Sequence, residues 1–137
     1  MEKNLEQLRA THAFNAAHKS DDPSHFAGVE GGRAVAKKVP AQIVQDGFLA
    51  SLAFAIEKGE GYEKVFRAVV DHLADPEVNC TFGARTDSLG NFLLDLSGKT
   101  GDQLRAVTSE VLAYLNYLRR FAKTGDNKEK GSADVHN

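Results

Sequence analysis

The stretch from Pro40 to Lys58, PAQIVQDGFLASLAFAIEK, constrains the fold of this chain more than any other segment. Between positions 47 and 56 the only polar side chain is Ser51, so a helix here is apolar on nearly every side. Such a helix is buried inside a bundle, because other helices must cover its several apolar faces. Length and the Ala and Leu content favour helix over strand, and Pro40 suits a first helical turn. We therefore predict a central buried helix over about 40–58.

Apolar residues recur at helical spacing along the rest of the chain. The pattern is clearest from Tyr62 to Leu73, and Asp75-Pro76 ends that helix because a residue before proline avoids the α region. Asp102 is the expected N-terminal cap of the last helix. The other predicted helices cover residues 2–19, 33–38, 89–96 and 103–123, and no segment is predicted as a strand. The sequence thus predicts an all-α fold, a single compact bundle of five to six helices around the central one.

Length and composition indicate one domain without covalent cross-links. A chain of 137 residues can bury about two-thirds of its unfolded surface. The single cysteine, Cys80, excludes an internal disulfide and a cysteine-based zinc site, and it suits a reducing cytoplasm. The charged first residues predict no signal peptide, and the apolar run is shorter than the roughly 20 residues of a membrane span. We predict a bundle domain over 1–123 and, from its polar composition, a disordered tail over 124–137.

Residue types that support catalysis do not form a convincing motif. The segment SGKTG at 97–101 resembles part of a phosphate-binding loop, but that loop needs a second glycine five residues before Gly98, where this chain has Leu93. None of the five histidines lies three or four residues from another on a predicted helix, so no local metal pair is expected. His12 falls on the apolar side of the first helix and is predicted to be a hydrogen-bonded core histidine. We therefore predict no enzyme activity, no metal and no cofactor.

Cations on the outer side of the last helix are the main candidate for a binding face. A net charge of −2 gives no overall attraction to nucleic acid, so any binding must use a local basic face. Arginine can bind two phosphate oxygens at once, which suits a phosphate backbone, although cations also favourably oppose a helix dipole. The candidates are Arg105, Arg119, Arg120 and Lys123 on the last helix, Lys37 and Lys38 before the central helix, and Arg9 if the first helix packs alongside.

Three segments, taken together and in order, form a family pattern. They are LRA at 8–10 with Ala13, KKVPAQIVQDGFLASLAFAIEKG at 37–59, and RAVTSEVLAYLNYLRRFAK at 105–123. The second has a basic residue and Val39-Pro40 before an isoleucine, followed by a glycine turn and Leu-Ala-Phe. The third ends in Arg119-Arg120, a hydrophobic residue and alanine. These features resemble the small all-helical subunit of the type III-B CRISPR effector, the RNA-targeting Cmr complex.

The resemblance implies a non-catalytic subunit of a ribonucleoprotein in antiviral defence. Several copies would stack along the CRISPR RNA–target RNA duplex and stabilise the bound target through a basic face. The implied partners are the backbones of both RNAs, other subunits of the Cmr complex and further copies of the chain. Lys38, Arg119 and Arg120 match the family pattern as RNA-binding residues, and helix geometry adds Arg9, Lys37, Arg105 and Lys123. Two alternatives stay open: a helical protein–protein adaptor without nucleic-acid contact, and a small enzyme with its site in residues 76–102.

Overall fold

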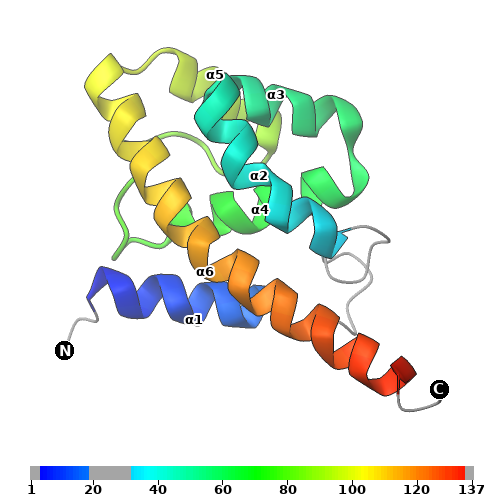
Figure 1. Ribbon diagram of the computed structural model, residues 1–137. Coiled ribbons are helices and arrows are strands. Elements are labelled where there is room, and N and C mark those ends of the chain that lie inside the picture. Colours follow the sequence, from blue (N-terminus) through cyan, green and yellow to red (C-terminus); the bar gives the residue numbers. More distant parts are fainter. Residues whose placement is uncertain (1–3, 19–31, 135–137) are drawn as a thin grey trace.

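The computed structural model describes residues 4–18 and 32–134, with only the backbone described at 32–33 and 123–134. Within these residues the chain forms six α-helices and no strand (Figure 1), so the predicted all-α fold is confirmed. The helices are α1 (Leu5–Ala17), α2 (Gly32–Asp46), α3 (Phe48–Lys58), α4 (Glu60–Ala74), α5 (Leu89–Ser97) and α6 (Gly101–Asp134). None of the helices in the described part has both the length and the apolar character that crossing a membrane requires.

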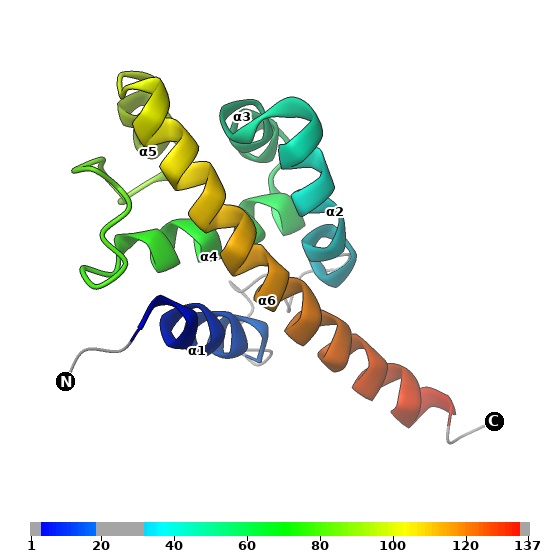
Figure 2. The same cartoon turned by 60° about the vertical axis from the view of Figure 1, so that its left-hand side comes forward.

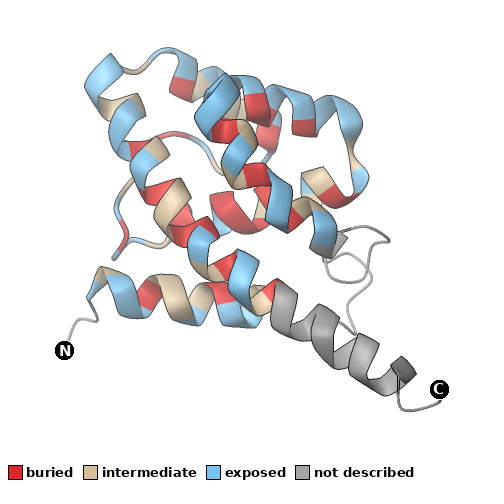
Figure 3. Ribbon diagram, viewed as in Figure 1, coloured by how far each residue is buried: buried red, intermediate tan, exposed pale blue. Residues whose placement is uncertain are grey.

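The long helix α6 organises the bundle. It contacts α1, α2 and α4, as the two views in Figures 1 and 2 show. The short helices α3 and α5 pack on each other and on α4 at the other end of the molecule. Figure 3 shows buried residues on the inward faces of the helices and exposed residues on the outward faces. The outer side of α6 is therefore open over much of its described length.

The predicted central helix over 40–58 is wrong in two respects. The chain breaks at Gly47 into α2 and α3, and the φ of Gly47 is 95°, a value that side-chain-bearing residues rarely adopt. Helix α3 is also not buried on all sides, since Phe54 is 38% exposed and Ile56 is 41% exposed. The helix with covered faces is α4, which carries eight buried residues between Gly61 and Leu73. The apolar helix α3 therefore lies at the edge of the core, whereas the amphipathic helix α4 occupies its centre.

Pro40 lies inside α2 instead of starting a helix, so the predicted helix 33–38 and the beginning of the predicted central helix are one element. Proline removes one helical hydrogen bond, which usually bends or ends a helix. Here the helix continues because Ala36, Val39 and Ile43, on one face of α2, are all buried in the core. Burying apolar side chains is worth about 0.8 kcal/mol per methylene group, enough to compensate for one lost backbone bond.

The start of α6 also differs from the prediction, because its cap is Thr100 and not Asp102. The Thr100 hydroxyl accepts from the Gln103 backbone N–H at 3.1 Å, and the Gln103 side chain accepts from the Thr100 N–H at 3.1 Å. This reciprocal pair is a capping box. The backbone of α6 continues to Asp134, beyond the predicted end at Lys123. The proposed division into a bundle and a disordered tail over 124–137 stays a prediction.

The segment between α4 and α5 forms turns and loops, as predicted for residues 76–88. Arg85 fixes it to α5 through the carboxylate of Asp95, which accepts from the Arg85 backbone N–H at 2.8 Å and from its guanidinium at 3.0 Å. These hydrogen bonds lower the pKa of Asp95 to about 2. The loop is thus positioned by a surface ion pair and not only by its buried Val78 and Ala84.

Candidate nucleic-acid interface

Arg119 and Arg120 lie on the exposed face of α6, opposite a stripe of buried core residues. The Arg119 guanidinium donates to the Asn116 side-chain oxygen at 3.2 Å, and Arg120 also has an interaction partner within the protein. Arg105 lies earlier on the same exposed face and forms an ion pair with Asp102. The helical wheel therefore placed these three cations correctly on the outside of α6, and their binding to RNA stays a prediction.

Lys37 and Lys38 are exposed on α2, whose opposite face is buried in the core. Helix α2 packs directly against α6, as Figure 1 shows, so these lysines and the α6 arginines belong to neighbouring helices. The side chain of Lys123 lies outside the described residues. The candidate RNA-binding cations in the described part of the chain are Lys37 and Lys38 on α2 together with Arg105, Arg119 and Arg120 on α6. We call this set the basic face, and that its two groups point to a common side stays a prediction.

Arg9 behaves differently from the other predicted RNA-binding residues. Helix α1 does pack against α6, as the prediction required, but the Arg9 guanidinium points at Glu110. Its Nε lies 2.8 Å from Glu110 Oε2, and its Nη2 lies 2.7 Å from Glu110 Oε1. The Arg9 side chain is 23% exposed and the Glu110 side chain is 6% exposed. Arg9 can therefore bind a phosphate only by giving up a largely buried, two-pronged ion pair.

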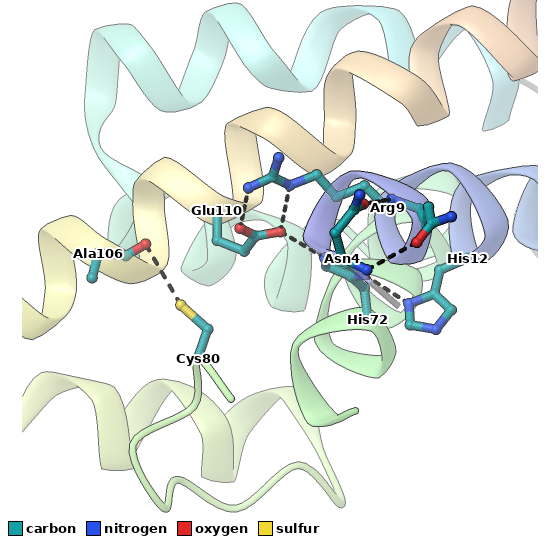
Figure 4. Close-up of polar contacts among 8 residues, drawn as sticks. Asn4, Arg9, His12, His72, Cys80, Ala106 and Glu110 are labelled. Atoms are coloured by element: carbon teal, nitrogen blue, oxygen red, sulfur yellow. Dashed lines mark hydrogen bonds and ion pairs between the residues drawn. The ribbon is translucent and has the colours of Figure 1, made fainter. Parts of the chain in front are cut away.

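Glu110 is the centre of a larger set of buried polar contacts (Figure 4). Its Oε2 also lies 2.9 Å from Nε2 of His72, whose side chain is fully buried and stacks on the Tyr114 ring. Nδ1 of His72 lies 2.8 Å from Nδ1 of His12, and Nε2 of His12 lies 3.1 Å from Asp75 Oδ2. We call Arg9, His12, His72, Asp75 and Glu110 the buried network. It joins α1, α4 and α6.

The surroundings of the buried network determine its charges. Burial acts to raise the pKa of Glu110, but hydrogen bonds from Arg9 and His72 outweigh it and hold that pKa below its usual value. Burial lowers the pKa of His72, and the hydrogen bond to Glu110 offsets this only in part. The hydrogen bond to Glu110 raises the pKa of Arg9. Glu110 is therefore a carboxylate at neutral pH, and Arg9 is its permanent counter-charge.

Among the described side chains, no group of three or more His, Cys, Asp and Glu residues is arranged to hold a metal ion. Cys80 is half-buried next to the network, and its thiol lies 3.6 Å from the backbone oxygen of Ala106. Burial raises the pKa of the Cys80 thiol, so at neutral pH it is not an activated nucleophile.

Comparison with known protein families shows which family this chain belongs to. A family model described as CRISPR-associated protein (Cas_Cmr5) matches residues 5–125, from the first residue of α1 far into α6. The chain belongs to the Cas_Cmr5 family. It is a CRISPR-associated subunit of the Cmr type, and membership implies association with other Cmr subunits. No curated protein and no solved structure matches the chain significantly.

Sequence reasoning overlooked the polar core of this Cas_Cmr5 subunit. Glu110 follows Val107 by three residues and precedes Tyr114 by four, which puts it on the buried face of α6. His72 likewise lies three residues after the buried Val69. A charge at such a position needs a partner, because burying an unpaired charge is very costly. The sequence therefore could have predicted a buried, paired Glu110, but it could not predict which helix supplies the partner. The predicted hydrogen bonding of His12 is confirmed, although its side chain is only half-buried.

Proposed function

We propose that this Cmr subunit is non-catalytic and stabilises target RNA by binding the phosphate backbone with its basic face. Further copies would stack beside it along the CRISPR RNA–target RNA duplex, as part of antiviral defence. The observation that carries the proposal is the exposure of Arg119 and Arg120 on the outer face of a helix whose inner face is core. Such side chains can meet a ligand without any rearrangement of the bundle.

The charge pattern supports backbone contact and not base recognition. The molecule has a net charge of −2, so attraction to RNA depends on the basic face alone. Duplexes that contain RNA are recognised mostly through shape, phosphates and 2′-hydroxyls, for which arginine and lysine suffice. Affinity should therefore be modest for an isolated subunit and should fall as salt rises, because few phosphates are contacted.

The buried network supports a non-catalytic role. Both ring nitrogens of His12 and of His72 already face a polar atom of the protein within 3.1 Å. A general acid or base must reach a proton of the substrate, and neither histidine has a ring nitrogen left for that contact. The carboxylate of Glu110 is likewise occupied by Arg9 and His72. These groups hold helices together.

Exposed apolar side chains support contacts with neighbouring subunits. Val44 at the end of α2 is 74% exposed and Leu94 on α5 is 61% exposed. Phe54 and Ile56 of α3 are partly exposed as well. We assign protein contacts to these exposed apolar side chains and RNA contacts to the basic face.

Charge reversal of the basic face tests the RNA half of the proposal. We expect Arg119→Glu with Arg120→Glu to weaken target-RNA binding by the assembled complex about tenfold or more, and to reduce the salt dependence by about two phosphate contacts. The control is Lys58→Glu with Lys64→Glu, which changes the net charge equally on α3 and α4. Fluorescence anisotropy with labelled target RNA at several salt concentrations measures both effects.

Both double variants should fold and assemble, because Arg119, Arg120 and Lys58 are exposed and Lys64 is half-buried at the surface, outside the core. Substitutions of surface side chains usually change stability by no more than about 0.5 kcal/mol each. If the Arg119 and Arg120 variant binds target RNA as tightly as the unchanged complex, the subunit is a protein–protein adaptor and its cations serve solubility. An equal loss in the control variant would show that net charge, and not the basic face, determines affinity.

A further inference from the structure

Two histidines lie at the centre of the buried network, and their four ring nitrogens form three polar contacts. Nε2 of His72 faces the Glu110 carboxylate at 2.9 Å, and Nε2 of His12 faces Asp75 at 3.1 Å. The third contact joins the two Nδ1 atoms at 2.8 Å. Each distance is that of a hydrogen bond, so each pair of atoms needs one hydrogen between them.

Counting hydrogens determines the charge of the pair. An ionised carboxylate can only accept, so the hydrogen facing Glu110 lies on Nε2 of His72, and the one facing Asp75 lies on Nε2 of His12. The contact between the two Nδ1 atoms needs a third hydrogen. Two neutral imidazoles carry only two ring hydrogens in total. The pair therefore holds one proton more than two neutral rings.

We propose that His12 and His72 share a single proton between their Nδ1 atoms, and that the resulting cation holds α1 against α4. The charges then balance, with Arg9 and the histidine pair opposite the carboxylates of Glu110 and Asp75. The charged and titratable groups that face the pair are Arg9 on α1, Asp75 at the C-terminal end of α4, and Glu110 and Tyr114 on α6. Cys80, in the loop after α4, acts electrostatically on Glu110, and Asp71 on α4 acts on Tyr114.

A second proton on the pair is disfavoured for two reasons. Two imidazolium rings would direct N–H groups at each other across 2.8 Å. His72 is also fully buried against the Tyr114 ring, and burial lowers its pKa. The contact between the two Nδ1 atoms therefore has room for one proton and not for two.

This count predicts how stability depends on pH. In the unfolded chain each histidine has a pKa of about 6.5, so the two together bind one proton on average near pH 6.5. Below that pH the unfolded chain binds more protons than the native pair, so stability rises with pH. Above it the unfolded chain binds fewer, so stability falls until the native pair releases its proton. The contribution of the pair therefore has a maximum near pH 6.5, and the unfolding equilibrium constant changes by up to tenfold per pH unit on either side.

Nitrogen NMR of the histidine rings in the full chain tests the shared proton directly. We expect both Nε2 atoms to stay protonated from about pH 5.5 to 8.5 while the two Nδ1 signals change together, with one common midpoint and one proton released. His12→Gln assigns the signals. Two independent midpoints, or an Nε2 atom without its hydrogen at neutral pH, would overturn the proposal.

Chemical denaturation across the same pH range provides a second test. In His12→Gln the amide can donate to Nδ1 of His72 without a proton from solution, so the loss of stability above pH 6.5 should disappear. The control is His18→Gln, which alters an exposed histidine at the end of α1 that stacks on the Phe14 ring and lies within hydrogen-bond distance of the Phe14 carbonyl. Identical pH profiles for the His12 variant and the unchanged protein would contradict the shared proton.

Discussion

Glu110→Ala is expected to lower the free energy of unfolding by about 3–5 kcal/mol, the usual cost of removing one partner from a buried ion pair. The substitution leaves the Arg9 guanidinium with 23% exposure and no carboxylate, and it leaves Nε2 of the fully buried His72 without an acceptor. Arg9 can recover part of its hydration by turning outward, so the lower end of this range is expected. Urea denaturation at neutral pH measures the change.

A matched exposed pair shows what burial contributes. Asp71→Ala removes the ion pair with Arg67, in which the Asp71 side chain is 66% exposed. Exposed pairs one helical turn apart are worth about 0.3–0.5 kcal/mol, so this variant should remain close to the unchanged protein. Equal losses for Glu110→Ala and Asp71→Ala would contradict the structural role of the buried network.

Phe66→Ala is expected to cost about 3–5 kcal/mol, because it opens a cavity at the centre of α4. Phe66 is fully buried and its ring stacks on Phe48, with centroids 6.0 Å apart. The control is Phe54→Ala on α3, where the ring is 38% exposed and a loss of about 1–2 kcal/mol is expected. A larger loss at Phe54 than at Phe66 would place α3, and not α4, at the centre of the core.

The position of α3 is also where the sequence-based prediction of the fold differs from the structure. The helical class follows from periodicity, which is strongest from Tyr62 to Leu73 and recovers α4 well. Hydrophobicity alone wrongly placed α3 at the centre, because an apolar helix can also lie at the edge of a bundle with some apolar surface exposed. The break at Gly47 depends on a positive φ that glycine permits but does not require.

The candidate site was predictable only where it depends on a single helix. The exposure of Arg119 and Arg120 follows from their angle to the apolar stripe of α6, so a helical wheel suffices. The inward turn of Arg9 depends on Glu110, 101 residues away, and on which faces of α1 and α6 meet. No local pattern carries that information, since it arises from the packing of separate helices.

The central claim, that α2 and α6 bear the RNA-binding surface of this Cmr subunit, is tested most directly by ultraviolet cross-linking of the assembled complex to target RNA. Mass spectrometry then identifies the linked peptides. The account predicts cross-links around Lys38 on α2 and around Arg119 and Arg120 on α6. Cross-links confined to α3, α4 and α5, or none to this subunit while its neighbours are labelled, would contradict it.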